Sequence, residues 1–343
     1  MLNPAKLLAA EFLKRTPATL LGAGVSLSLV DFVLLYCAAS RDGVLHLRPG
    51  VGLLENYGLL ATILNDGVLI CLAKVYCDAI QSLAVSKAIV DIEPVERSLA
   101  RLRAMINMDR QYQFLMYLLL VIGWAYWLSN LGFHVLGHPD EHWAHKVFDS
   151  PDHPFAFLMS RVHNFFSWIV ILPLVGHVII YATIQLNRTF AIAARKRVLQ
   201  YDLLNPDQKG GFLCVERAHL AFNVIMALLY IQITLHLETF ARMRVEHVVA
   251  YATLTLLLIG INHSFLGSVY ATIDALRTAA LNAVKEKVYQ DDKLSFEILK
   301  YCYEHSGNRF ALVNFVVQAG AILFSGAVKL LPVILPQVYQ SLR

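Results

Sequence analysis

Long runs of hydrophobic residues alternate with polar, charged segments along this chain. Seven runs are each long enough to cross the hydrocarbon core of a bilayer, which takes roughly 20 residues as helix. They cover residues 18–40, 57–80, 113–136, 162–186, 218–240, 248–273 and 310–331. Membrane strands need only about ten alternating residues, so runs of this length favour helices over a barrel. The pattern predicts an all-α protein, a polytopic transmembrane helical bundle with about seven spans.

The long polar segments all fall on one side of the predicted membrane, at residues 81–111, 187–217 and 274–309. Pro94 suits the first turn of a helix. The stretch 275–289 contains no proline or glycine, and Asp291 and Asp292 can cap a helix over 293–305. We therefore expect one transmembrane domain over residues 1–343, with its spans prolonged as cytoplasmic helices.

The composition and the charge distribution of the chain agree with a membrane protein that lies in a lipid bilayer. Hydrophobic residues make up 57% and charged residues 16%, against about 45–50% and about 25% in soluble domains. Between the predicted spans, 20 Lys and Arg residues fall on one side and 7 on the other. The positive-inside rule then places the N-terminus in the cytoplasm. The basic cytoplasmic segments either contact anionic lipid or receive an anionic ligand such as a nucleotide or oligonucleotide.

Ionisable residues inside spans are costly and usually serve a function. Asp31 lies 13 residues from the inner end of the first span and Asp66 lies 14 from that of the second, so the two carboxylates share a depth. Such a pair can hold a proton or a cation. Alternatively, each acid is satisfied separately, by a hydroxyl group or by Lys74.

The last predicted span carries a small and polar stripe on one helical face. Its residues are Asn314, Gln318, Ala321, Ser325 and Lys329, spaced four, three, four and four apart. In a symmetric homo-oligomer this stripe could line a pore, with Lys329 near the outer mouth. A seam between two helices collects the same residue types.

Histidines allow two further interpretations. His163 and His177 in the fourth span and His247 and His263 at the sixth could clamp haem between parallel helices, although the unequal spacings of 14 and 16 oppose this. Without haem, no cofactor is expected. In the outer loop after the third span, His138, His142 and His145 share a helical face and could bind a divalent metal.

A loop before the fifth span has the sequence Asn-Pro-Asp-Gln-Lys-Gly-Gly-Phe, residues 205–212. Its turn residues leave backbone N–H groups able to cap a helix or to cradle an anion, with Asp207, Lys209, Gly210 and Gly211 as the candidate ligand-binding residues. The loop resembles the H-P-D-x-x-G-G-L loop of poorly characterised bacterial multi-pass proteins, with Asn205 and Phe212 replacing the histidine and leucine. The resemblance implies a bacterial inner membrane and little about activity.

No Walker loop, G-x-S-x-G elbow, H-E-x-x-H motif or Rossmann fingerprint occurs, so no enzymatic activity is expected. The polar stripe and the helical collar favour a homo-oligomeric membrane channel or pore-forming effector gated from the cytoplasm, for example by a nucleotide-type ligand. In architecture such a protein is similar to membrane effectors of anti-phage defence systems such as Hailong. The alternatives are an ion- or proton-coupled transporter using Asp31 and Asp66, a haem-binding electron-transfer protein, and a structural partner of another membrane protein.

Overall fold

The computed structural model describes residues 14–46, 52–54, 56–103, 152–207, 209–238, 245–288 and 293–305, with scattered residues between 114 and 128. For some of these, including 245–266, it describes the backbone alone. The described chain is built of helices, with one isolated bridge between Ile89 and Leu199. The all-α prediction is therefore confirmed for this part of the chain.

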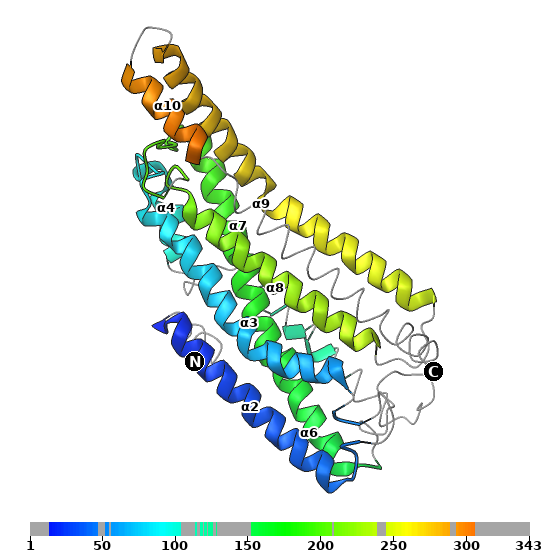
Figure 1. The fold of residues 1–343 in the computed structure, drawn as a ribbon. Helices are drawn as coiled ribbons and strands as arrows, with labels where there is room; N and C mark the ends of the chain where they lie inside the picture. Colours follow the sequence, from blue (N-terminus) through cyan, green and yellow to red (C-terminus); the bar gives the residue numbers. More distant parts are fainter. Residues whose placement is uncertain are drawn as a thin grey trace, which may run out of the picture.

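The helices are long and lie side by side (Figure 1). They are α2 (Pro17–Arg41), α3 (Tyr57–Ser82), α4 (Glu96–Arg103), α6 (Pro154–Phe165), α7 (Leu172–Lys196), α8 (Leu213–Glu238), α9 (Val245–Val288) and α10 (Lys293–His305). Short turns of 3₁₀-helix, η1 (Leu83–Val85) and η2 (Glu93–Val95), precede α4. A π-helical segment, η4 (Phe166–Ile171), joins α6 to α7 without a break.

Four helices are long and apolar enough to cross a membrane: Pro17–Arg41, Gly58–Ser82, Pro154–Lys196 and Leu213–Gln232. They correspond to the first, second, fourth and fifth predicted spans. The sixth, 248–273, lies within α9. The third, 113–136, is described only at scattered residues, where Trp124 meets Phe165 edge-on at 5.7 Å between ring centroids. The seventh, 310–331, lies outside the described residues, so the count of seven stays a prediction.

Local signals fix where these helices begin. The Thr16 side chain accepts a hydrogen bond from the Thr19 backbone N–H at 3.2 Å, and Pro17 occupies the first turn of α2. Asn56 caps α3 in the same way through Leu59 N–H at 3.1 Å. A carboxylate oxygen of Asp42, just after α2, accepts the Ala156 N–H at 2.7 Å and so ties the end of α2 to the start of α6.

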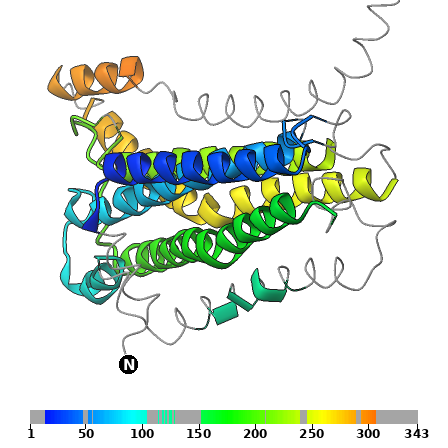
Figure 2. The ribbon, with the colours of Figure 1, turned by 90° about the horizontal axis from the view of Figure 1, so that it is seen from below.

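The two ends of the helices differ. At the end where α2 stops and α3 and α6 start, here called the Arg41 end, the described connection from α2 to α3 is short. The opposite end, here called the α10 end, carries α4, α10 and the last turns of α9 (Figures 1 and 2). With 44 residues, α9 is about 66 Å long, more than twice a hydrocarbon core of about 30 Å. At the α10 end, α9 continues past the end of α7 (Figure 1), as the sequence predicted for 275–289.

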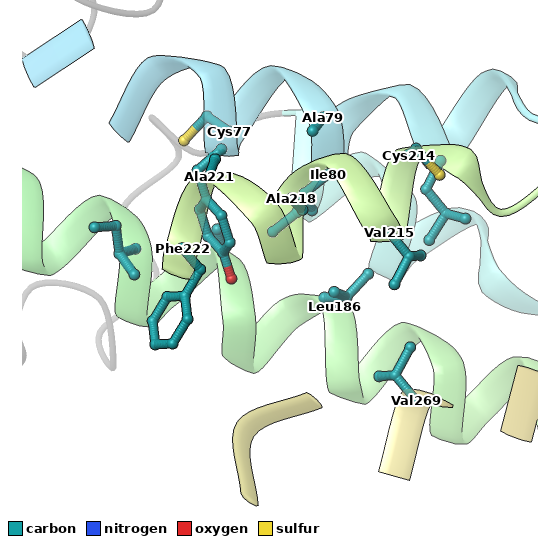
Figure 3. Close-up of a cluster of buried hydrophobic side chains, with 14 of the residues drawn as sticks. Cys77, Ala79, Ile80, Leu186, Cys214, Val215, Ala218, Ala221, Phe222 and Val269 are labelled. Carbon is teal, nitrogen blue, oxygen red and sulfur yellow. The ribbon is translucent and has the colours of Figure 1, made fainter. Parts of the chain in front are cut away.

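The main buried cluster lies where α3, α7 and α8 meet, with Val269 of α9 at its edge (Figure 3). Tyr76 and Phe222 pack within it at 6.2 Å between ring centroids. A smaller cluster joins α2, α3 and α6. By contrast, many large apolar side chains on the outer face of α2 are exposed, among them Val25, Leu29 and Val33, as expected of a helix that faces lipid.

Candidate functional site

Three ionisable side chains from three helices meet at one depth. Asp31 lies ten residues from the Arg41 end of α2, while Asp66 and His163 each lie nine residues from the starts of α3 and α6. At about 1.5 Å per residue, all three are about 14–15 Å from the Arg41 end, which is about half the thickness of a hydrocarbon core. We call Asp31, Asp66, His163 and Ser167 the mid-membrane cluster.

The contacts within this cluster are short. His163 Nδ1 lies 2.5 Å from Asp31 Oδ2. The Ser167 hydroxyl donates a hydrogen bond to Asp66 Oδ2. The Asp66 carboxyl group also interacts electrostatically with both His163 and Asp31. His163 is therefore in direct contact with Asp31, and Asp66 lies near enough to both groups for their charges to act on it.

The members of the cluster differ in how far they are exposed to solvent. His163 is 2% exposed and Asp66 is 9% exposed, whereas the Asp31 side chain is 26% exposed. Buried ionisable groups must be paired or change their protonation, because an isolated charge is poorly solvated there. Asp66 and His163 are therefore the members at which an unpaired charge would be least solvated.

A close helix crossing brings Asp31 to the cluster. A Cβ atom added at Gly67 of α3 would lie 2.4 Å from the Gly24 carbonyl carbon and oxygen, so the backbones of α2 and α3 touch. Ser28 and Asp31 follow Gly24 by four and seven residues, which puts them on the same face of α2. Small residues at this crossing let α2 approach closely enough for Asp31 to reach His163.

The π-helical segment sets the position of Ser167. Pro173 follows this segment and has no N–H group for the usual bond to the carbonyl four residues earlier. A proline inside a long helix disturbs the hydrogen-bond ladder on its N-terminal side, and one-turn π segments are often found at functional sites. Ser167 is buried within this wider turn and directs its hydroxyl group to Asp66.

Two buried polar atoms in or beside the cluster have no hydrogen-bond partner among the described residues. They are His163 Nε2 and the hydroxyl of Ser28, which is 8% exposed. Because its Nδ1 faces a carboxylate, the His163 ring can hold a proton toward Asp31 and still receive or release one at Nε2. The cluster therefore holds two carboxyl groups and an imidazole ring whose Nε2 has no hydrogen-bond partner among the described residues.

Lys74 does not neutralise either acid. Its ammonium group pairs with Asp78, one turn further along α3. From the sequence, a hydroxyl group or Lys74 is a candidate partner of each acid. In the structure, the Ser167 hydroxyl group is bonded to Asp66, and Lys74 is paired with Asp78 instead of Asp31 or Asp66. The difference has a geometric cause, because Lys74 follows Asp66 by eight residues, about 12 Å along the helix.

Metal and haem ligation find no support in the described residues. No three His, Cys, Asp or Glu side chains there are arranged to hold a metal ion. His138, His142 and His145 lie outside the described residues, and so do the side chains of His177, His247 and His263. The outer metal site and the haem site stay predictions, and His163 is already in contact with Asp31.

The loop over residues 205–212 caps α8. Asp207 Oδ1 accepts the N–H groups of Lys209 at 2.8 Å and Gly211 at 3.1 Å, and its Oδ2 accepts that of Leu213 at 3.3 Å. Lys209 Nζ pairs with Glu216 Oε1 at 3.2 Å. In the sequence these backbone N–H groups are candidate ligands for an anion, but in the structure they are hydrogen-bonded to Asp207. Of the two interpretations, the geometry corresponds to a helix cap.

Both glycines in this loop have positive φ, 66° at Gly210 and 91° at Gly211. A Cβ at Gly210 would come within 2.6 Å of the Tyr201 ring. The next residue, Phe212, is 1% exposed and packs against Tyr201 and Phe190. The glycines therefore let the chain turn tightly and bury Phe212 where α8 begins.

The proposed pore-lining residues Asn314, Gln318, Ser325 and Lys329 lie outside the described residues, so the channel hypothesis stays a prediction. Sequence reasoning missed the pairing of His163 with Asp31, because the predicted fourth span began at residue 162 and put His163 at its outer edge, whereas the helix begins at Pro154. Comparison of the chain with protein families, with curated proteins and with solved structures finds no match.

Proposed function

We propose that this protein is a proton-translocating membrane transporter whose proton-binding site is the mid-membrane cluster. The observation that carries the proposal is the contact of buried His163 with Asp31, beside the buried carboxyl group of Asp66. Ionisable groups at this depth are expensive and are typical of proton relays. Of the functions considered from sequence, ion- or proton-coupled transport is the one that uses Asp31 and Asp66.

The charge balance of the cluster favours the proton as the carried species. With both carboxylates ionised and His163 protonated, the net charge is −1, and one further proton makes the cluster neutral. A single proton therefore moves the site between two states of low charge, which suits a low-dielectric environment. A divalent ion would need at least three converging ligands, an arrangement not found among the described side chains.

In this proposal the α10 end faces the cytoplasm of a bacterium and the Arg41 end faces outward across the inner membrane. The excess of Lys and Arg in the segments at the α10 end supports this orientation through the positive-inside rule. A proton crossing the membrane would then pass through the cluster about halfway.

Proton flux into liposomes tests the proposal. Purified protein is reconstituted with a pH-sensitive dye inside, and a potassium gradient with valinomycin makes the interior negative. The wild type should acidify the interior faster than protein-free vesicles do, and Asp66→Asn should reduce that excess at least tenfold. Asp91→Asn is the matched control, because Asp91 is an exposed aspartate outside the candidate spans and should keep full flux.

Size-exclusion elution and helical circular dichroism in detergent establish that each variant is folded. His163→Gln provides a second test should Asp66→Asn fail to fold, since glutamine keeps a polar group but cannot take up a proton. Wild-type flux in either folded variant would overturn the proposal. So would a wild-type rate equal to that of empty vesicles.

A further inference from the structure

Three consecutive residues of α9 contact α7, the main buried cluster and α8 in turn. The Ser268 hydroxyl donates a hydrogen bond to Asn187 Oδ1 of α7 at 2.9 Å. Val269 is 0% exposed and lies at the edge of the main buried cluster (Figure 3). The Tyr270 hydroxyl lies 2.9 Å from His219 Nδ1 of α8, and the two rings are 5.1 Å apart between centroids. This last contact joins α8 to α9 through a histidine, a side chain that can change its charge.

A carboxyl group lies beside this histidine. Glu216 precedes His219 by one turn of α8, and its charge acts on the Tyr270 hydroxyl group. Its Oε1 pairs with Lys209 Nζ at 3.2 Å, whereas its Oε2 is buried and has no hydrogen-bond partner among the described residues. A buried carboxylate oxygen without a donor is costly, so a donor that turned toward it would stabilise this region. We call Glu216, His219 and Tyr270 the α8–α9 polar contact.

The charged groups around this contact balance one another. Lys209 and Arg277 are positive groups that act on Glu216, and Asp207 is a negative one. With Glu216 and Asp207 ionised, the charges of these four side chains cancel. Asp274, further along α9, is exposed to solvent. A proton on His219 would therefore add one charge to neutral surroundings, one turn from the Glu216 carboxylate, which favours it.

The contact lies near the α10 side of the membrane. The Leu228 carbonyl oxygen accepts a hydrogen bond from Asn65, the residue before Asp66, so Leu228 marks the depth of the mid-membrane cluster on α8. His219 precedes Leu228 by nine residues, about 13–14 Å toward the α10 end. Together with the distance of about 14–15 Å from the Arg41 end to the cluster, this places His219 about 28 Å from that end, close to the full thickness of a hydrocarbon core. His219 is half-buried there, so protons from the α10 side need not cross the bilayer to reach it.

We infer that the α8–α9 polar contact is a second proton-binding site, which responds to the pH on the α10 side. This goes beyond the proposed function, because it uses none of the residues of the mid-membrane cluster. When His219 is neutral, the Tyr270 hydroxyl group donates to its Nδ1. A proton taken up from the α10 side resides on Nδ1, which then donates to the Tyr270 oxygen, and the Tyr270 hydroxyl hydrogen turns to Glu216 Oε2. Proton binding thus adds one hydrogen bond between α8 and α9 and holds α9 more firmly.

Nitrogen-15 NMR of the full-length, histidine-labelled protein in liposomes tests the site. The His219 ring signals, identified by their loss in His219→Gln, should titrate with a midpoint between pH 5 and 8. Glu216→Gln should lower that midpoint by about half a pH unit or more, which is an about threefold weaker proton affinity, because the carboxylate stabilises the charged ring. Glu297→Gln, at an exposed glutamate on α10, is the matched control and should leave the midpoint unchanged. Should His219→Gln fold poorly, Tyr270→Phe identifies the same signals by shifting them.

Hydrogen exchange tests the effect on α9. After correction for intrinsic rates, the backbone amides of residues 268–288 should exchange at least threefold more slowly below the midpoint than above it, and Tyr270→Phe should abolish this difference. A His219 signal that does not titrate between pH 5 and 8, an unchanged midpoint in Glu216→Gln, or equal exchange in the two states would each overturn the inference. None of these measurements uses proton flux, so their outcome is independent of whether Asp66→Asn carries wild-type flux.

Discussion

Substitution of Gly67 by alanine should both destabilise the protein and disable its proton site. The new Cβ would lie 2.4 Å from the Gly24 backbone, whereas ordinary contacts begin at 3.4 Å, so α2 and α3 must separate by about 1 Å. Overpacking of this kind costs about 1–3 kcal/mol, against a gain in helix propensity of about 1 kcal/mol. Because α2 carries Asp31, the same shift would displace Asp31 and disturb its contact with His163 on α6.

Thermal unfolding in detergent and proton flux in liposomes measure the two effects. Gly22→Ala is the matched control, because it lies on the same helix as Gly24 and a Cβ there would meet nothing within 4 Å. This control should be as stable as the wild type or slightly more so, with unchanged flux. If Gly67→Ala unfolded at the temperature of Gly22→Ala and carried the same flux, the close crossing would not be what positions Asp31.

Two further substitutions test the remaining contacts. Asp207→Ala should destabilise the protein by about 1–3 kcal/mol in chemical unfolding, because three backbone N–H groups at the start of α8 lose their acceptor. The control Asp202→Ala loses one exposed hydrogen bond, from Leu204 N–H, and should cost only about a few tenths of a kcal/mol. Tyr76→Phe should cost about 1 kcal/mol, since its hydroxyl is hydrogen-bonded to Thr183 in the buried cluster. A loss for Asp202→Ala equal to that for Asp207→Ala, or no loss for Tyr76→Phe, would contradict these assignments.

Hydropathy was sufficient to predict the long helices, because apolar length alone determines whether a segment can span lipid. Helix α10 was predicted from a different signal, the two helix-capping residues Asp291 and Asp292 just before Lys293. Hydropathy did not predict the π-helical segment. Pro173 marks a disturbance within the fourth span, but the sequence does not reveal how the backbone will accommodate a proline.

The candidate site was predictable only in part. Depth along a helix follows from residue counting, and it correctly placed Asp31 and Asp66 at one level. Rotation about the helix axis and the choice of neighbouring helices depend on packing, so the partners of these acids could not be read from the sequence. His163 was considered as a haem ligand because His177 lies in the same predicted span. Nothing in the sequence distinguishes Ser28 and Ser167 from the other serines of the chain.

The loop at residues 205–212 illustrates the same limit. Its turn residues predicted backbone N–H groups that are not used within a helix, and in the structure the Asp207 carboxylate accepts three of them. Whether an external anion or an internal carboxylate accepts them depends on where the Asp207 side chain points, and it points to Lys209, Gly211 and Leu213. A carboxylate inside the motif is the feature that favours the cap.

The central claim is that a carboxyl group of the mid-membrane cluster holds a proton within the bilayer. Dicyclohexylcarbodiimide measures this directly, because it adds to protonated carboxyl groups in apolar surroundings and leaves a stable N-acylurea that peptide mass spectrometry can locate. The account predicts an adduct on Asp66, the buried acid of the cluster, in native membranes, and this adduct should decline as the pH rises and the carboxyl proton is lost. Absence of an adduct on Asp66 at every pH would contradict it.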